Sequence, residues 1–175
     1  MIVKILWLVK IMISCNSFAP IYDEQSKILI LGSMPGKRSL AMQQYYAHPQ
    51  NRFWKMLGEI FRTETGCTYE ERKAFLLQHK IALWDVLKYC ERESSLDSDI
   101  RNEIPNDVTE LLRENPQIQA IFCNGGKAAA SFKKYFSGAF SQLDVYYYHS
   151  TSPANARMSL TDLVLEWQII RKYLD

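Results

Sequence analysis

A ten-residue stretch of the sequence gathers aromatic, imidazole, amide and guanidinium side chains. It reads Tyr45-Tyr-Ala-His-Pro-Gln-Asn-Arg-Phe-Trp54. Aromatic faces stack on nucleobases and amide groups form hydrogen bonds with base edges. A neutral amide such as Asn51 is no Brønsted base at pH 7, but it can orient a water molecule and offer its carbonyl dipole to developing positive charge. The structural alternative makes Phe53 and Trp54 helix core and Asn51 a helix cap, and for Asn51 both roles are compatible.

Two further segments are polar and rich in turn-forming residues. Gly32-Ser-Met-Pro-Gly36 follows one aliphatic run, and His149-Ser-Thr-Ser-Pro-Ala-Asn-Ala156 follows another. The first segment lacks the G-K-[ST] of a P-loop and the spaced glycines of a dinucleotide fingerprint, which argues against both nucleotide motifs. A triad of Ser33, His149 and Asp85 is formally possible, but no G-x-S-x-G elbow supports it.

The hydrophobic pattern predicts the elements that position these segments. Short apolar runs indicate strands at 27–32, 81–84, 118–123 and 143–148, of which the first and the third are expected to be buried. Apolar residues at helical spacing and capping residues indicate helices at 51–61, 70–79, 105–115, 127–136 and 159–174. The segments 33–49 and 91–104 show no clear period and are expected to be loops. Strands that alternate with helices predict an α/β fold with a parallel sheet covered on both faces.

Each predicted strand is followed by polar or turn-forming residues. Gly32-Ser-Met-Pro-Gly36 follows the first strand, Asp85 the second, Asn124-Gly-Gly126 the third and His149-Ser150 the fourth. Ligands of such sheets bind outside the carboxyl ends of the strands. We therefore expect one crevice that all four loops share.

Composition is typical of one globular domain. The 175 residues are 47% apolar and 23% charged, with a formal net charge of +2, which excludes a disordered or histone-like chain. The four cysteines are scattered without a C-x-x-C pair, so no zinc site or iron–sulfur cluster is expected. His48 and His149 are weak candidates for a metal pair, because the chain has three histidines and no H-x-x-x-H. No coiled-coil heptads occur, and we expect a monomer.

The first sixteen residues differ from the rest of the chain. Met1 to Ser14 is apolar with lysines at positions 4 and 10, and Cys15 follows it. A signal peptide or lipid anchor is one interpretation. We favour an over-long start, with Met12 beginning the functional chain, or a short appended element. We accordingly expect an N-terminal extension at 1–16, a single domain at 17–175, and a cytoplasmic protein that neither spans nor binds a membrane.

The paired motifs Gly32-Ser-Met-Pro-Gly36 and Tyr46-Ala-His-Pro-Gln-Asn-Arg-Phe-Trp54 resemble the uracil-DNA glycosylase superfamily. The S-M-P form and the late S-T-S-P-A-N-A loop resemble its hypoxanthine-specific branch, the DNA-deoxyinosine glycosylases. The resemblance covers about 17–174 and implies a three-layer α/β/α fold around a four-stranded parallel sheet, with a flipped base in the crevice. Sister branches carry Asn, Asp or Glu in the first motif. This chain has Ser33 and Met34 there, which argues against ordinary uracil excision.

The resemblance also assigns roles to residues of the crevice. It makes Asn51 the catalytic amide, and it places His149 or Ser150 against the leaving base. The residues expected to contact the base are Gly32, Ser33, Met34, Tyr46, Asp85 and Asn124. Tyr46 would stack on the base. Asp85 would read the base or hold a neighbouring loop, and Asn124 would read the base edge or cap the following helix.

DNA contacts are expected on both sides of the crevice. The candidates are Lys37, Arg38, Arg52, Lys127, Ser152, Pro153, Asn155 and Arg157. For the basic residues, ordinary solvated charge is the competing interpretation. Sister enzymes insert a leucine about where Ala154 lies. Because alanine is too small to fill the space left by a flipped nucleotide, we expect Asn155 or Arg157 to do so.

The reaction expected from these residues is hydrolysis of an N-glycosidic bond in DNA without a cofactor. No Schiff-base lysine is evident among the crevice motifs apart from Lys127, so we expect a monofunctional enzyme. The partner would be DNA that contains a deaminated base, chiefly hypoxanthine. Two alternatives remain open: a uracil- or mismatch-specific glycosylase, and a non-catalytic protein that binds DNA lesions.

Overall fold

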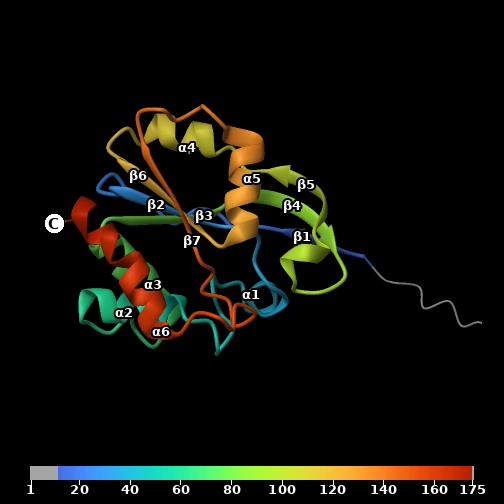
Figure 1. The fold of residues 1–175 in the computed structure, drawn as a ribbon, viewed down its shortest axis with the longest axis horizontal. Coiled ribbons are helices and arrows are strands. Elements are labelled where there is room, and N and C mark those ends of the chain that lie inside the picture. Colours follow the sequence, from blue (N-terminus) through green and yellow to red (C-terminus); the bar gives the residue numbers. More distant parts are fainter. Residues whose placement is uncertain (1–11, 175) are drawn as a thin grey trace, which may run out of the picture.

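Four strands form a parallel sheet at the centre of the molecule (Figure 1). A computed structural model describes residues 12–174. The sheet order is β3 (Ile81–Asp85), β2 (Ile28–Gly32), β6 (Ala120–Asn124) and β7 (Asp144–Tyr148). One face carries α2 (Phe53–Phe61), α3 (Tyr69–Gln78) and α6 (Leu160–Trp167); the other carries α4 (Val108–Glu114) and α5 (Gly126–Phe136). The expected three-layer α/β/α fold is confirmed.

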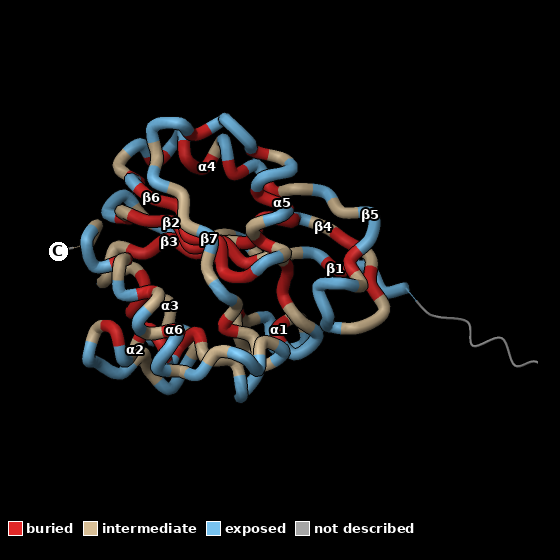
Figure 2. The backbone as a smooth tube through the Cα atoms, viewed as in Figure 1, coloured by how far each residue is buried: buried red, intermediate tan, exposed pale blue. Residues whose placement is uncertain are grey.

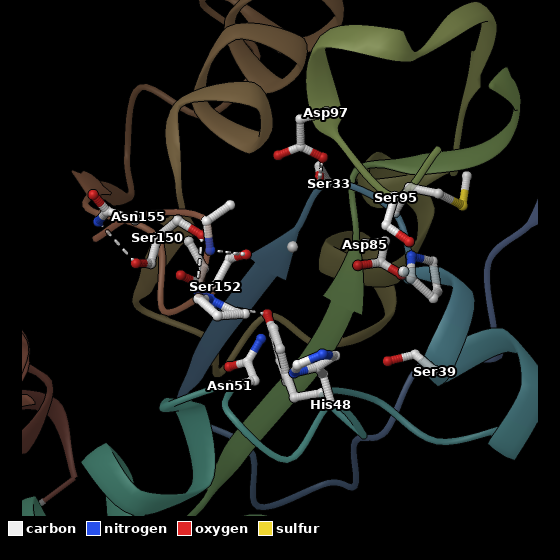
Figure 3. A pocket seen from close by; sticks show the side chains of 18 of the residues that line it. Ser33, Ser39, His48, Asn51, Asp85, Ser95, Asp97, Ser150, Ser152 and Asn155 are labelled. Carbon is white, nitrogen blue, oxygen red and sulfur yellow. Dashed lines mark hydrogen bonds between the residues drawn. The ribbon is translucent and has the colours of Figure 1, made fainter. Parts of the chain in front are cut away.

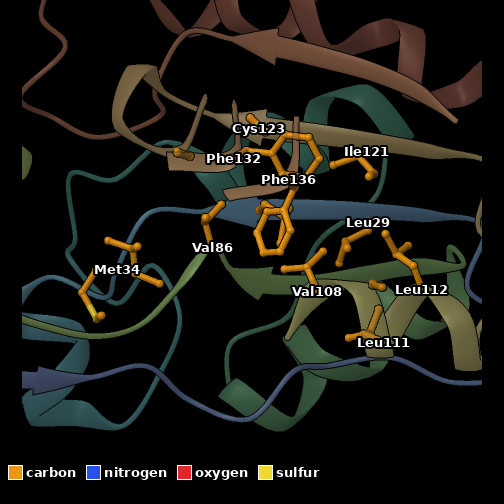
Figure 4. Packing of buried hydrophobic residues seen from close by; sticks show 14 of the residues in the cluster. Leu29, Met34, Val86, Val108, Leu111, Leu112, Ile121, Cys123, Phe132 and Phe136 are labelled. Atoms are coloured by element: carbon orange, nitrogen blue, oxygen red, sulfur yellow. The ribbon is translucent and has the colours of Figure 1, made fainter. Parts of the chain in front are cut away.

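The alternating side chains of β2 feed two hydrophobic layers. Ile28 and Ile30 pack in the layer that includes α2, α3 and α6, whereas Leu29 and Leu31 pack with α4 and α5. All four side chains are fully buried, as expected for a strand covered on both faces. Figure 2 shows the buried residues concentrated on the sheet and on the inner sides of the helices. Figure 4 shows Leu29 among residues of α4 and α5 such as Val108 and Phe136.

Helix ends follow their local sequence. The Ser159 hydroxyl accepts a hydrogen bond from the Asp162 backbone N–H at 3.1 Å, and Asp162 Oδ2 accepts one from the Ser159 N–H at 2.9 Å. This capping box begins α6, as the sequence predicted. The helix expected to continue to 174 instead passes into a 3₁₀ segment, η2 (Gln168–Tyr173). Trp167 and Ile170 remain buried across the change, so the apolar face is retained.

The expectation of a loop at 91–104 is wrong. The chain there completes β4 (Leu87–Arg92), forms the short 3₁₀ turn η1 (Asp97–Asp99) and returns as β5 (Arg101–Pro105). These strands and β1 (Ile13–Asn16) form an antiparallel sheet in the order β1-β4-β5. Strand β5 lies at the edge and is largely exposed, so its sequence lacks the apolar alternation of a half-buried strand.

The segment 33–49 is not structureless either, because it contains α1 (Lys37–Met42). This helix begins after Gly36 and ends at Gln43 in the left-handed conformation, at φ 54°. Six residues are too few to show a helical period, although Ser39 is buried.

The N-terminal predictions fall partly outside the described residues. Residues 1–11 are not described, whereas 13–16 form β1, in which Cys15 lies opposite Cys90 of β4. The predicted domain boundary between residues 16 and 17 stays a prediction. Strand β1, which pairs with β4, lies directly before it. Within the described chain, no helix is long and apolar enough to cross a membrane.

Candidate active site

The carboxyl ends of all four parallel strands open into one cavity of about 790 Å³. The last residue of each strand lines it: Gly32, Asp85, Asn124 and Tyr148. The sequence-predicted site residues among its walls are Gly32, Ser33, Met34, Lys37, Arg38, Tyr46, Asn51, Asp85, Asn124, His149, Ser150, Ser152, Pro153 and Asn155. The structure therefore brings together the three polar motifs of the sequence and two single residues, Asp85 and Asn124.

Asn51 enters this cavity from the turn that precedes α2. Its Oδ1 accepts a hydrogen bond from the Phe53 backbone N–H at 3.0 Å, and its own N–H donates to the His48 carbonyl at 2.8 Å. The N-cap of α2 is Arg52 and has no side-chain cap bond, so the expectation that Asn51 is the helix cap is wrong. The bond from Phe53 instead holds the turn before the helix. A carbonyl oxygen has two lone pairs, so one lone pair and the Nδ2 hydrogens remain for a ligand. Figure 3 shows Asn51 and His48 at one end of the cavity.

Two contacts hold the Tyr46 side chain in place. Its ring stacks on Phe53 with centroids 3.9 Å apart, and its hydroxyl accepts from Asn124 Nδ2 at 3.0 Å. Asn124 Nδ2 also donates to Thr151 Oγ1, and Asn124 Oδ1 accepts from the Thr151 N–H, each at 3.0 Å. The alternative that Asn124 caps the following helix is wrong, because the N-cap of α5 is Gly125 and there is no side-chain cap. Asn124 instead ties Tyr46 to the loop after β7.

Asp85 is a buried carboxyl on the floor of the cavity, 3% exposed. Ser17 Oγ donates a 2.7 Å hydrogen bond to its Oδ2. Burial raises the pKa of Asp85 to about 7, even though the Ser17 hydrogen bond opposes the shift. A Cβ at Gly32 would lie 2.4 Å from Asp85 Oδ1, so only glycine fits beside this carboxyl.

A second carboxylate reaches the cavity from the turn between β4 and β5. Asp97 Oδ1 accepts a 2.8 Å hydrogen bond from Ser33 Oγ. Figure 3 shows this pair at the end of the cavity opposite Asn51. Behind the first motif lies Arg92, 1% exposed, whose Nη2 donates to the Pro35 carbonyl. Its charge lowers the pKa values of both cavity carboxyls and so opposes the effect of burial.

His149 and Ser150 stand where β7 leaves the sheet. His149 Nδ1 lies 2.8 Å from Glu166 Oε1 of α6, and its backbone N–H donates to Glu166 Oε2 at 3.0 Å. Ser150 approaches Gly125 closely: a Cβ at Gly125 would lie 2.8 Å from that of Ser150. Gly125 has φ +106°, a second reason for glycine there. Both candidates for contact with the base line the cavity, and the exposed His149 is oriented by α6.

The guanidinium of Arg52 is occupied by backbone carbonyls of the protein, which argues against its expected role as a phosphate contact. Its Nη2 donates to the carbonyls of Ser152 at 2.8 Å and Asn155 at 2.9 Å, and its Nη1 donates to the Met158 carbonyl. Its Nε donates to the Thr151 carbonyl at 3.4 Å. The guanidinium therefore holds the loop after β7 in shape from inside the protein.

The other basic candidates divide by position. Lys127 forms an ion pair with Glu103 and lies outside the cavity walls, which argues against a free phosphate contact. Arg157 is exposed but also lies outside those walls. Lys37 and Arg38, in contrast, line the cavity and are exposed. Lys37 Nζ donates to the Glu93 carbonyl at 2.9 Å. The cavity thus contains Lys37 in its wall, whereas the sequence analysis expects Lys127 as the lysine among the crevice motifs.

Sequence reasoning missed several residues that position the site. Ser17 carries no motif, and its contact with Asp85 joins positions 68 residues apart. Asp97 lies within 91–104, where the sequence predicts a loop. Only its acidic side chain indicates a functional residue there. Glu166 belongs to the predicted final helix, but nothing in the sequence shows which residue its side chain contacts. Thr151 is a buried polar residue next to Ser150. Its place in the polar segment after the fourth predicted strand is the sequence feature that could have identified it.

Within residues 12–174, no group of three or more His, Cys, Asp or Glu side chains is placed to hold a metal ion. The described cysteines Cys15, Cys67, Cys90 and Cys123 are all free thiols.

Comparisons with known proteins agree with this geometry. A hypoxanthine DNA glycosylase of Methanosarcina acetivorans is 35% identical over 159 residues, 90% of this chain and 98% of its own. A protein of the same description from Methanosarcina barkeri is 40% identical over 114 residues, 65% of this chain and 72% of its own. The solution structure of a Methanosarcina acetivorans protein assigned as a uracil DNA glycosylase superposes with a TM-score of 0.80 at 34% identity. It covers 93% of this chain and 99% of that chain.

More distant similarity extends to a mismatch enzyme. A G/U mismatch-specific uracil DNA glycosylase of Schizosaccharomyces pombe is 31% identical over 109 residues, 58% of this chain and 32% of its own. The profile of the Uracil DNA glycosylase superfamily matches residues 19–172, which include every residue that lines the cavity. The resemblance seen in the paired motifs is confirmed, and the chain belongs to the uracil DNA glycosylase superfamily.

Proposed function

We propose that this protein removes hypoxanthine from DNA by hydrolysing the N-glycosidic bond of deoxyinosine. The observation that carries the proposal is the placement of Asn51. Its amide lines the cavity and is oriented by the Phe53 backbone N–H. The first motif presents Ser33 and Met34 in the same cavity and contributes no amide or carboxylate of its own. The names of the two Methanosarcina relatives support the same substrate.

The chemistry asked of Asn51 matches what an amide can do. Cleavage of an N-glycosidic bond passes through an oxocarbenium-like sugar, which needs little nucleophilic push. Asn51 orients the attacking water through its free lone pair and places its carbonyl dipole near the developing positive charge. The bond to Phe53 fixes the amide in advance, so no reorganisation is required at the moment of reaction.

The leaving purine takes up the electron pair of the broken bond and must be met by hydrogen-bond donors. Ser150 and His149 approach from the end of β7, and Glu166 fixes the imidazole ring. Asp85 has a pKa of about 7, so close to neutral pH a substantial fraction carries a proton that it can donate to the base. An ionised Asp85 would instead repel the departing anion. The base-binding role of Asp85 thus depends on its burial.

Tyr46 supplies the aromatic surface for the base. Phe53 covers one face of its ring, and the hydroxyl is held by Asn124, so the ring orientation is set before a base arrives. Tyr46 lines the cavity, which makes its second face the stacking surface in this proposal.

A uracil-specific activity is the second candidate, favoured by the similarity to the mismatch enzyme. The test uses duplex DNA with one deoxyinosine or one deoxyuridine, followed by alkali to cleave abasic sites. Release from the deoxyinosine strand, with little from deoxyuridine, is expected. Release chiefly from deoxyuridine would overturn the proposed specificity. Retained binding with no release from either strand would favour a non-catalytic lesion-binding protein.

The proposed enzyme is monofunctional. Lys37 lines the cavity, but its amine is bound to the Glu93 carbonyl, and Lys127 is paired with Glu103. Borohydride treatment during turnover should therefore trap no covalent protein–DNA adduct. A trapped adduct would show Schiff-base chemistry instead. The proposal also includes a cytoplasmic location and a monomer that acts on duplex DNA. Sedimentation with and without DNA would test the monomeric state.

A further inference from the structure

The imidazole of His48 lines the cavity at the same end as the Asn51 amide (Figure 3). The two residues belong to one tight turn, because the Asn51 N–H donates to the His48 carbonyl at 2.8 Å. His48 is exposed, so water can reach its ring. The imidazole is therefore available to a small ligand that Asn51 also contacts.

A backbone hydrogen bond determines which ring nitrogen of His48 carries the hydrogen. The Gln50 N–H donates to His48 Nδ1 at 3.2 Å. Because a backbone N–H can only donate, Nδ1 is the acceptor, and the neutral ring carries its hydrogen on Nε2. Among residues 12–174, Nε2 has no hydrogen-bond partner. His48 therefore presents a free N–H donor, and its own turn holds the ring that carries it.

Asn51 supplies the opposite polarity at this end of the cavity. Its Oδ1 accepts from the Phe53 N–H at 3.0 Å and keeps a second lone pair. A water molecule that accepts from His48 Nε2 and donates to Asn51 Oδ1 has one lone pair left. Two fixed contacts set the direction of that lone pair, whereas a single contact leaves the water free to rotate. The imidazole and the amide together thus orient a nucleophile better than the amide alone.

We propose that His48 is a second catalytic residue, which holds the attacking water together with Asn51. This inference rests on the proposed function, because the water must attack the sugar of deoxyinosine. The water oxygen bonds to C1′ while the C1′–N9 bond breaks, and the electron pair of that bond leaves with the purine. The water loses one proton to solvent and the departing base gains one, so no further reactant is required. His48 donates a hydrogen bond during this step and is not the base.

Two substitutions separate this role from a structural one. Asparagine at position 48 can accept from the Gln50 N–H, as Asn side chains do two residues ahead in a turn, but its amide reaches only the position of Nδ1. Glutamine is longer and offers an N–H near the position of Nε2. His48→Asn should therefore lose roughly tenfold or more of the single-turnover rate at saturating enzyme, and His48→Gln should keep most of it. A purely structural role predicts the reverse order.

Gln50→Ala is the matched control. It keeps the backbone N–H that bonds to His48, and Gln50 is exposed and lies outside the cavity walls. Its excision rate should equal that of wild type. Binding of the deoxyinosine duplex is the second readout. His48→Asn should bind within about twofold of wild type with an unchanged salt slope, because the variant loses a contact to water and not to a phosphate.

The outcomes that contradict the inference are distinct. Weaker binding of His48→Asn with a lower salt slope and an unchanged saturated rate would identify a phosphate contact and overturn the inference. A rate for His48→Asn close to that of wild type, or equal losses in His48→Asn and His48→Gln, would also overturn it. In these cases wild type still releases hypoxanthine, so the proposed function stands. Wild type that releases no base would overturn the proposed function, and the inference with it.

Discussion

The Ser17 hydroxyl donates a 2.7 Å hydrogen bond to Oδ2 of Asp85, and so joins the segment after β1 to the floor of the cavity. The contact orients a carboxyl that is otherwise surrounded by buried groups. Asp97 raises the pKa of this carboxyl and Arg92 lowers it, while burial is the largest influence. The protonation of Asp85 therefore depends on its burial, on the Ser17 hydrogen bond and on these two neighbouring charges.

Protein stability should depend on this proton. The pKa of Asp85 is raised from 3.8 to about 7 on folding, so between these values the folded chain holds a proton that the unfolded chain releases. Its contribution to stability is complete below pH 4 and is lost as the pH rises through 7. Asp85→Asn, which stays neutral, should be more stable than wild type at pH 8 by on the order of 2–4 kcal/mol, and similar to it near pH 4. Urea unfolding of both proteins across this range measures the difference, and a difference independent of pH would contradict the assignment.

Gly32→Ala should damage both the fold and the site. The new Cβ would lie 2.4 Å from Asp85 Oδ1 and 3.1 Å from the Tyr46 hydroxyl, so Asp85 or the backbone must shift. Overpacking of this kind costs about 1–3 kcal/mol. Gly126→Ala is the control, because no atom lies within 4 Å of a Cβ there and the residue is helical. Thermal unfolding should show a lower Tm for Gly32→Ala but not for Gly126→Ala. Equal Tm values for the two variants would show that Gly32 and Asp85 are not in close contact.

Arg52→Lys should impair excision without changing the salt dependence of DNA binding. Lysine cannot reproduce the fork of bonds to the Ser152 and Asn155 carbonyls, so the loop after β7 should loosen. Limited proteolysis should then cut within 150–158 faster than in wild type. A reduced slope of log K against log salt, with unchanged proteolysis, would instead restore Arg52 as a phosphate contact.

Arg38→Ala should show the opposite behaviour. Arg38 is exposed and lines the cavity, and loss of one phosphate contact lowers the salt slope by about one. Binding of duplex DNA is measured at several salt concentrations. Lys133→Ala is a suitable comparison, because Lys133 lies over the Tyr147 ring and does not line the cavity. Identical slopes for Arg38→Ala and wild type would exclude the phosphate contact.

The sheet and its cavity could be predicted from the sequence because both depend on local patterns. The run from Ile28 to Leu31 is aliphatic throughout, which identifies a strand covered on two faces, and the polar residue after each strand marks the shared edge. For Asn51 the sequence predicts catalysis and capping; the N-cap is instead Arg52, and the Asn51 side chain bonds to the first helical N–H, that of Phe53. Its catalytic role stays a prediction.

What could not be predicted depends on contacts between distant segments. Strand β5 is exposed on an edge, so no apolar alternation marked it, and Asp97 was hidden with it. The positive charge of Arg52 predicts a phosphate contact. Its actual partners are backbone carbonyls about a hundred residues away, and these have no signature in side-chain types. Ser17 was missed for the same reason.

The most direct test of the account is single-turnover excision from a deoxyinosine duplex by wild type and Asn51→Ser. Serine keeps an oxygen that can accept from the Phe53 N–H, so the turn before α2 and the Tm should be nearly retained. It lacks the amide that orients water. We predict that excision falls by roughly 10²- to 10³-fold, the range for loss of one oriented polar group in a catalytic site. A variant that folds as wild type and excises hypoxanthine within a few-fold of it would contradict the central role given to Asn51.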